Sequence, residues 1–176
     1  MQHPKLKEVL LPDFFAIGEK IAQLSGYDAC FYCAGISSIG MNEADFTRIT
    51  YDTTICVAAA LLKANPAMVF HYVSGLSTDS SEKGKMMWAR VKGRTENALM
   101  KLGFKGQYNF RPGFMAHFKE QKNVKTIFKV FGLFYPLLFP KSSLTLSEVG
   151  RAMIHAAQKG TEHRVLEIGD IKKWAS

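Results

Sequence analysis

Apolar residues recur along the chain in two alternating patterns, one typical of strands and the other typical of helices. Short, nearly continuous apolar runs predict strands at 6–11, 29–34, 68–74, 107–111 and 164–170. Between these runs, apolar residues recur every three or four positions, which predicts helices over 13–24, 42–63, 83–100 and 145–160. Strands that alternate with helices are typical of parallel sheets joined by right-handed crossovers. We therefore expect one α/β domain over 1–176 with a mainly parallel sheet.

The residues that suggest chemistry lie where the strand at 68–74 is followed by the helix at 83–100. Ser74 ends the strand, at the place where open α/β sheets bind their ligands. Trp88 and Lys92 are four residues apart in the helix, so their side chains share one face. This arrangement is typical of a reductase proton relay, in which a phenol donates the proton and a nearby ammonium lowers the phenol's pKa. The aromatic residue here is a tryptophan, whose indole N–H is not released near neutral pH.

Four segments carry a resemblance to a known family: YDACFYCAG at 27–35, YVS at 72–74, WARVKGRTE at 88–96 and NFRPGFM at 109–115. With these segments in the family's order, the chain resembles the short-chain dehydrogenase/reductase superfamily. The resemblance is to its atypical, epimerase-like branch, and within that to the Tat-interacting-protein-like oxidoreductases. It implies a Rossmann-like, doubly wound sheet, NAD or NADP as the cofactor, and a small carbonyl or hydroxyl compound as the substrate.

The same resemblance implies a role for individual residues. Ser74 would bind the substrate carbonyl, Lys92 would hold the cofactor ribose, and Trp88 would occupy the position of the catalytic tyrosine. These three are the expected catalytic residues. The expected cofactor-binding residues are Asp13, Ala34, Gly35, Lys92, Arg111, Pro112 and Gly113. No metal site is expected, because the cysteines of the CxxC at 30–33 lie in a strand, where positions three apart face opposite sides.

The sequence lacks the glycine-rich turn that opens most dinucleotide-binding folds. It contains no GxGxxG motif, whose helix N-terminus would receive the pyrophosphate, so we expect weak or absent NAD(P) binding. The run at 6–11 resembles the family's third strand, so the chain resembles an N-terminally truncated Rossmann fold that lacks about two strands and one helix. Such a sheet has a gap beside the apolar strand at 29–34. Either 6–11 pairs inward with 29–34, or two chains associate as a homo-oligomer; we favour association, because 29–34 needs cover on both faces.

Residues 114–145 break the alternation of strands and helices. The run at 127–140 is apolar nearly all round and is interrupted by Gly132 and Pro136. In folds related to this one the chain at this point forms the substrate cap, so we expect a cap or substrate-side segment over 114–145. The alternative is a membrane-surface anchor, which nearby lysines at 119, 122, 125 and 129 would favour.

Composition limits the remaining possibilities. The chain has 176 residues, of which 47% are hydrophobic and 12% aromatic, as expected for a folded domain with a sizeable core. Its net charge is +8, but the 23 Lys and Arg residues are scattered, which argues against nucleic acid as a partner. No signal peptide is recognised and no apolar stretch reaches about 18 residues, so a cytoplasmic protein is expected. Two functions stay open: an oxidoreductase-like enzyme, or a non-catalytic protein that binds a small ligand or a partner chain.

Overall fold

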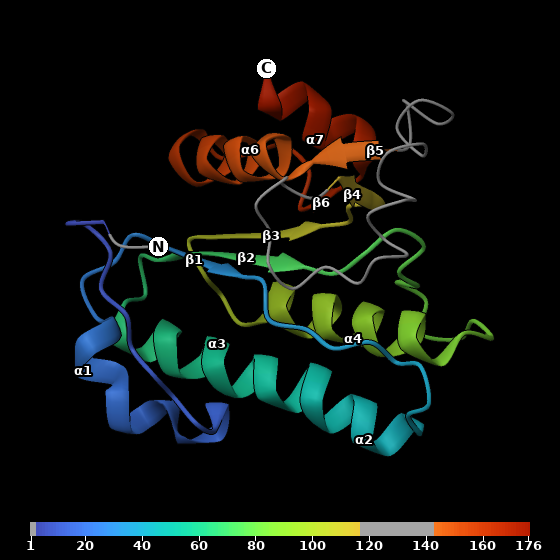
Figure 1. The fold of residues 1–176 in the computed structure, drawn as a ribbon, viewed down its shortest axis with the longest axis horizontal. Coiled ribbons are helices and arrows are strands. Elements are labelled where there is room, and N and C mark those ends of the chain that lie inside the picture. The colour runs from blue at the N-terminus through green and yellow to red at the C-terminus, as the bar shows by residue number, and fades with distance from the viewer. Residues whose placement is uncertain (1–2, 117–142) are drawn as a thin grey trace.

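A four-stranded parallel sheet forms the centre of the molecule (Figure 1). The computed structural model describes residues 3–116 and 143–176. The strands are β1 (Ala29–Tyr32), β2 (Val69–Val73), β3 (Gly106–Phe110) and β6 (Val165–Leu166), and they lie in the order β1-β2-β3-β6. The α/β class and the parallel sheet predicted from the sequence are confirmed.

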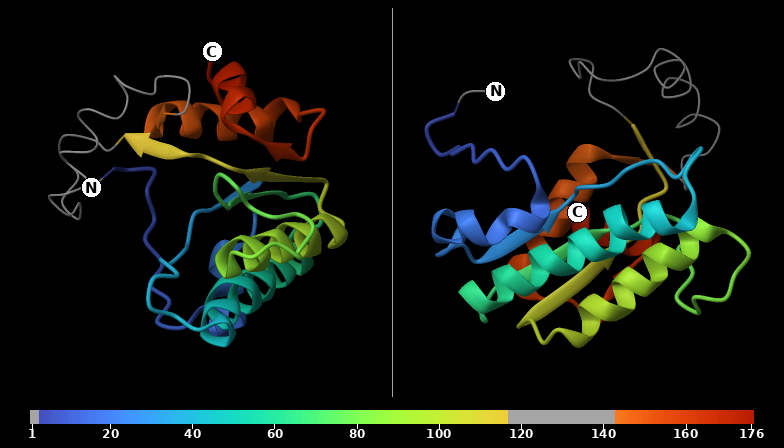
Figure 2. Two further views of the ribbon diagram at one scale, coloured as in Figure 1. Left: turned by 90° about the vertical axis from the view of Figure 1, so that its right-hand side faces the viewer. Right: turned by 90° about the horizontal axis from the view of Figure 1, so that it is seen from below.

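Helices cover both faces of this sheet, which makes it doubly wound (Figure 2). On one face lie α3 (Thr53–Ala64) and α4 (Met87–Lys101), whose apolar side chains form a core with Phe70 and Tyr72 of β2. On the other face lie α6 (Leu146–Lys159) and α7 (Ile168–Ala175), which bury Phe110 and Leu166. Side chains alternate between the two faces along each strand, so a single apolar strand contributes to both cores.

The N-terminal region differs from the prediction. Residues 6–11 form no strand; the segment is extended and leads into η1 (Phe14–Lys20), a 3-10 helix, and α1 (Ile21–Leu24). A strand exists only where a neighbour pairs with its backbone, and no backbone hydrogen bond joins 6–11 to β1. β1 is therefore an edge strand of the described sheet, and not the central strand, buried on both faces, that its apolar sequence predicted.

The long helix predicted over 42–63 is present, in three parts. Asn42 caps α2 (Glu43–Thr47), and its side chain accepts a hydrogen bond from the backbone N–H of Asp45. A π-helical turn, η2 (Arg48–Asp52), then leads into α3. α4 begins at Met87 and not at 83, because the chain before it folds into a turn around Asp79, whose carboxylate accepts from the N–H groups of Ser81 and Gly84.

The C-terminal elements follow the prediction in their order, a helix and then a last strand. Thr145 and Glu148 form a capping box at the start of α6, and Gly160 ends that helix with a positive φ of 70°. The strand predicted at 164–170 is shorter, because its second half belongs to α7. β4 (Phe114–Ala116) and β5 (Ser143–Thr145) form a separate two-stranded parallel sheet at the two ends of the predicted cap. The central part of that cap prediction, 117–142, lies outside the described residues.

Candidate functional site

The carboxyl ends of β2 and β3 bring several of the predicted site residues together. Ser74 follows β2, and its backbone N–H donates to the carbonyl of Phe110 at the end of β3 (2.9 Å). Two residues on, the N–H of Leu76 donates to the carbonyl of Pro112 (3.0 Å). The two chain segments therefore run side by side past the strand ends, which is where parallel α/β sheets bind ligands.

Lys92 reaches this place from α4. Its ammonium donates to the backbone carbonyl of Ser74 (Nζ to O, 2.5 Å). Burial lowers the pKa of Lys92, while the charge of Glu96, one turn further along α4, acts in the opposite direction. The structure thus brings Ser74 and Lys92 together, as predicted, through the serine's backbone.

The hydroxyl of Ser74 lies inside a buried network and donates to Oε1 of Glu96 (2.5 Å). Glu96 is fully buried, and its two carboxylate oxygens also accept from Nε (3.0 Å) and Nη2 (2.5 Å) of Arg111. A carboxylate that is buried this deeply is stable only when it is paired, and here a bidentate guanidinium pairs it. Ser74 is a member of this closed network, which we call the Glu96 network: Ser74, Ser80, Lys92, Glu96, Arg111 and Glu167.

Arg111 is the centre of that network. Besides Glu96, its guanidinium donates to the hydroxyl of Ser80 (2.5 Å) and to the carboxylate of Glu167 (3.1 Å). The hydrogen bond to Glu96 is the largest influence on the pKa of Arg111, which is raised above its ordinary value. The predicted cofactor-binding role of Arg111 would therefore have to use backbone atoms, since the side chain is committed to internal partners.

Trp88 is half-buried on α4, one turn before Lys92, which is the placement expected from its spacing. The same helix is approached closely by the turn that follows Ser74. A Cβ on Gly93 would come within 1.8 Å of the carbonyl oxygen of Asp79, so only glycine allows this contact. The turn and the helix thereby hold the residues around Trp88 in a fixed relation.

The other predicted cofactor residues are not members of the Glu96 network. Ala34 and Gly35 follow β1 and are exposed, and a Cβ on Gly35 would meet no atom within 4 Å. Gly113 follows the buried Pro112 and is half-buried. Asp13 caps η1, where its side chain accepts from the N–H of Phe15 (2.9 Å). The structure assigns this capping contact to Asp13; the adenine contact implied for it is untested.

Sequence analysis did not single out Glu96, Ser80, Glu167 or His71. Glu96 had a detectable signal, because it lies four residues after Lys92 and so shares its helix face. Ser80 and Glu167 had none, since they reach Arg111 from distant parts of the chain. His71 is fully buried among Phe31, Tyr108 and Phe110, with ring centroids 5.1, 5.5 and 5.2 Å away, and burial lowers its pKa to about 4.

The arrangement at the strand ends presents groups that can contact a ligand. An ammonium beside a strand end can hold ribose hydroxyls, and the exposed backbone after β1 leaves room for close approach of a ligand. Within 3–116 and 143–176, however, no strand and glycine-rich turn stand ahead of β1 to receive a pyrophosphate. The described residues also contain no cluster of three or more His, Cys, Asp or Glu side chains placed to hold a metal ion.

Comparisons with known proteins place the fold. No protein-family profile and no curated protein sequence matches the chain. Among solved structures, UDP-N-acetylglucosamine 4-epimerase from Bacillus cereus superposes with a TM-score of 0.64 at 16% identity, covering 92% of this chain and 68% of the epimerase. RMD from Pseudomonas aeruginosa, solved in complex with NADPH, superposes with a TM-score of 0.64 at 15% identity, covering 94% of this chain and 69% of RMD. At these identities the similarity establishes a Rossmann-like fold.

The described helices were also compared with the length and apolarity that a membrane span requires. None of them meets both requirements.

Proposed function

We propose that this chain is an oxidoreductase-like protein of the short-chain dehydrogenase/reductase type, which binds NAD or NADP weakly at the carboxyl end of β2. Its substrate would be a small carbonyl or hydroxyl compound. The observation that carries the proposal is the contact between Lys92 and Ser74, because it puts a half-buried ammonium beside the strand end where Rossmann-like folds bind their ligand. The NADPH in the RMD structure supports a nucleotide as the ligand.

Within this proposal each residue has a limited task. Lys92 would donate hydrogen bonds to the ribose, and the backbone at Ala34 and Gly35 would approach the nucleotide closely. Arg111 holds Glu96, and through it the hydroxyl of Ser74, so its contribution is to position the strand end. Binding would be weak, because pyrophosphate recognition depends on a helix N-terminus after a glycine-rich turn.

A titration of NADPH and NADH by isothermal calorimetry tests the proposal. We expect a dissociation constant well above micromolar, of the order of 10⁻⁵ to 10⁻³ M. Lys92→Ala should weaken binding by about tenfold, which is the loss of one hydrogen bond to a charged donor. The control is Lys101→Ala, on the exposed side of the same helix, which should bind as the wild type does.

Three results of that titration would count against the proposal. If millimolar NADPH or NADH gives no heat of binding, the chain does not bind a nucleotide and that part of the proposal is wrong. A submicromolar dissociation constant would contradict weak binding. If the wild type and Lys92→Ala bind the nucleotide with equal affinity, Lys92 does not contact it. Thermal unfolding of both variants separates lost contacts from lost structure, since Lys92 also binds a backbone carbonyl.

A second candidate function is a non-catalytic ligand-binding protein, and two observations favour it. Trp88, which the resemblance aligns with the acid, cannot release its indole N–H proton near neutral pH, and the hydroxyl of Ser74 donates to Glu96. Trp88→Tyr separates the two candidates. If the variant oxidises NADPH in the presence of small aldehydes and ketones and the wild type does not, the site is a reductase site without its acid. If neither turns over while both bind NADPH, the non-catalytic function is supported.

A further inference from the structure

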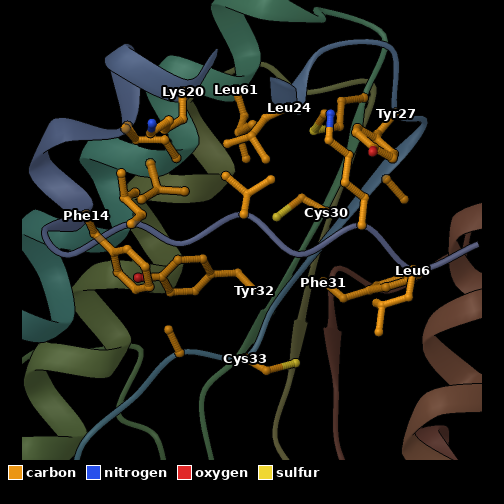
Figure 3. A pocket seen from close by; sticks show the side chains of 18 of the residues that line it. Leu6, Phe14, Lys20, Leu24, Tyr27, Cys30, Phe31, Tyr32, Cys33 and Leu61 are labelled. Carbon is orange, nitrogen blue, oxygen red and sulfur yellow. The ribbon is translucent and has the colours of Figure 1, made fainter. Parts of the chain in front are cut away.

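A cavity of about 590 Å³ lies beside β1, at the place where the sheet ends (Figure 3). The extended segment 5–11 forms one wall, β1 forms another, and residues of η1, α1 and α3 complete the lining. The lining is largely apolar and includes Leu24, Cys30, Tyr32 and Leu61. The cavity is therefore the gap between 6–11 and β1, and segment 5–11 does not fill it.

The backbone of β1 offers hydrogen bonds to this gap. The N–H of Val69 in β2 donates to the carbonyl of Asp28, and Val69 is the register partner of Ala29. In a parallel pair, such a residue bonds to the two residues that flank its partner, so Asp28 and Cys30 face β2. By alternation, the N–H and C=O groups of Ala29 and Phe31 point away from β2, toward the open edge. No hydrogen bond of the described residues reaches them.

The surroundings of this edge are apolar, but they are not protected as edge strands usually are. Leu6, Tyr27 and Phe31 are 59%, 51% and 44% exposed. Protected edge strands usually carry a charged side chain, a proline or a bulge, and β1 has none of these. An edge of this kind adds a further strand readily, because the new strand satisfies backbone groups and covers apolar side chains together.

The charged groups around the cavity favour one kind of strand. Among the described residues that line it, the charged ones are Lys5, Lys7 and Lys20, and no carboxylate is among them. A strand with acidic residues at its ends would meet complementary charge.

We propose that the β1 edge is a docking site for an extended peptide segment of a partner protein, with an apolar centre and acidic residues on both sides. The segment would add to the sheet beside β1, with alternate side chains in the cavity. This site adjoins the proposed nucleotide site at Ala34, which lines the cavity, but the docking proposal does not depend on nucleotide binding.

A second copy of this chain is the competing occupant, and charge disfavours it. Each copy carries a net charge of +8, and each would bring its own Lys5 and Lys7 to the shared edge. Segment 5–11 also borders the gap and limits it to a narrow occupant, whereas pairing of two sheets would require that segment to move away.

The test is a fluorescence-anisotropy titration with a labelled nine-residue synthetic peptide that has two glutamates at each end and the core Val-Thr-Ile-Thr-Val. We expect a dissociation constant of about 10–100 µM for the wild-type chain. The same peptide with lysines at its ends should not bind. A version that is N-methylated at the central isoleucine should also fail, because it lacks a backbone donor for the ladder.

Two matched variants of the chain locate the site. Phe31→Pro removes the N–H that points to the gap and leaves the bonds to β2, so it should abolish binding; Phe31→Ala keeps the N–H and should weaken binding by no more than about threefold. Lys5→Glu with Lys7→Glu, both on exposed residues, should weaken binding by about tenfold. If Phe31→Pro does not fold by circular dichroism, the charge variant and the N-methylated peptide decide the question.

Several outcomes would overturn the proposal. If the glutamate-ended and lysine-ended peptides bind with equal affinity, the site does not select a segment with acidic ends. Unchanged binding by Phe31→Pro would place the peptide elsewhere. A wild-type dimer in sedimentation velocity that Phe31→Pro dissociates, and that does not take up the peptide, would assign the edge to a second copy.

Discussion

Two regions of the sheet differ in how completely their polar groups are satisfied. At the carboxyl ends of β2 and β3, the Glu96 network joins the buried Ser74, Glu96 and Arg111 to the more exposed Ser80 and Glu167 through hydrogen bonds. At β1, by contrast, backbone donors and acceptors face a gap that is lined with apolar side chains. The first region has its partners inside the chain, and the second lacks partners within the described residues.

The comparison shows that the residues resembling a catalytic site and the groups open to a new ligand lie in different regions. Ser74 and Lys92 meet at the end of β2, as the sequence analysis expected, yet each has an internal partner that a ligand would have to displace or share. The edge at β1 matches no catalytic motif, yet its backbone groups are open to a new partner. The resemblance to a known family therefore indicates a site at the ends of β2 and β3. The unsatisfied backbone hydrogen-bonding groups indicate a binding site at the edge of β1.

The largest expected effect comes from breaking the closed region at Glu96. Glu96→Gln leaves the guanidinium of Arg111 without its bidentate carboxylate, so the free energy of unfolding should fall by about 3–5 kcal/mol. Chemical denaturation measures this loss. The control is Glu43→Gln, which removes the ion pair to Arg90, where the Glu43 side chain is 53% exposed; it should change stability by less than about 1 kcal/mol. Equal losses in the two variants would show that the Glu96 network adds little.

The next effect in size concerns His71, which lies on β2 but contacts Phe31 of the open edge. Burial lowers its pKa from 6.5 to about 4, so the unfolded chain binds a proton between these two values and the folded chain does not. Stability should therefore fall as the pH falls from 6.5 to 4, by about 3 kcal/mol in total from this residue. His71→Phe should flatten this part of the profile in denaturation measured across the range. If His71→Phe loses stability with falling pH as steeply as the wild type, other titratable groups cause the pH dependence.

A smaller effect is expected at the contact that holds the turn after Ser74 against α4. Gly93→Ala would place a Cβ 1.8 Å from the carbonyl oxygen of Asp79, so the turn must shift, at a cost of about 1–3 kcal/mol. Gly150→Ala, inside α6, is the matched control, since its Cβ meets no atom within 4 Å. It should raise stability by about 0.5–1 kcal/mol, because alanine favours the helix. Thermal unfolding that moves in the same direction for both variants would contradict the close contact.

Much of the fold could be predicted from local sequence signals, where those signals and the tertiary structure agree. The helix starts predicted near 42 and 145 are correct, and in the structure Asn42 and Thr145 cap these helices, because side-chain capping is a local interaction. The prediction of a strand at 6–11 was wrong, because here the local signal and the tertiary structure disagree. Its apolar sequence is compatible with a strand, but strand formation depends on a neighbour that no local pattern can supply.

The candidate site shows the same division. Helical spacing correctly placed Trp88 and Lys92 on α4, and strand length placed Ser74 at the end of β2. The hydrogen bond from Ser74 to Glu96 and the three partners of Arg111 could not be predicted, because they join residues up to 56 positions apart. Sequence spacing therefore identified which residues are near the strand end, and only the structure gives their partners.

Amide hydrogen exchange along β1, followed by NMR, tests the contrast between the two regions most directly. We predict an alternating pattern: the amides of Ala29 and Phe31 exchange fast, while those of Cys30 and Tyr32, which face β2, exchange slowly, as does the amide of Ser74. Adding the glutamate-ended peptide should slow exchange at Ala29 and Phe31 alone. Slow exchange at Ala29 and Phe31 in the free chain would contradict an open edge at β1.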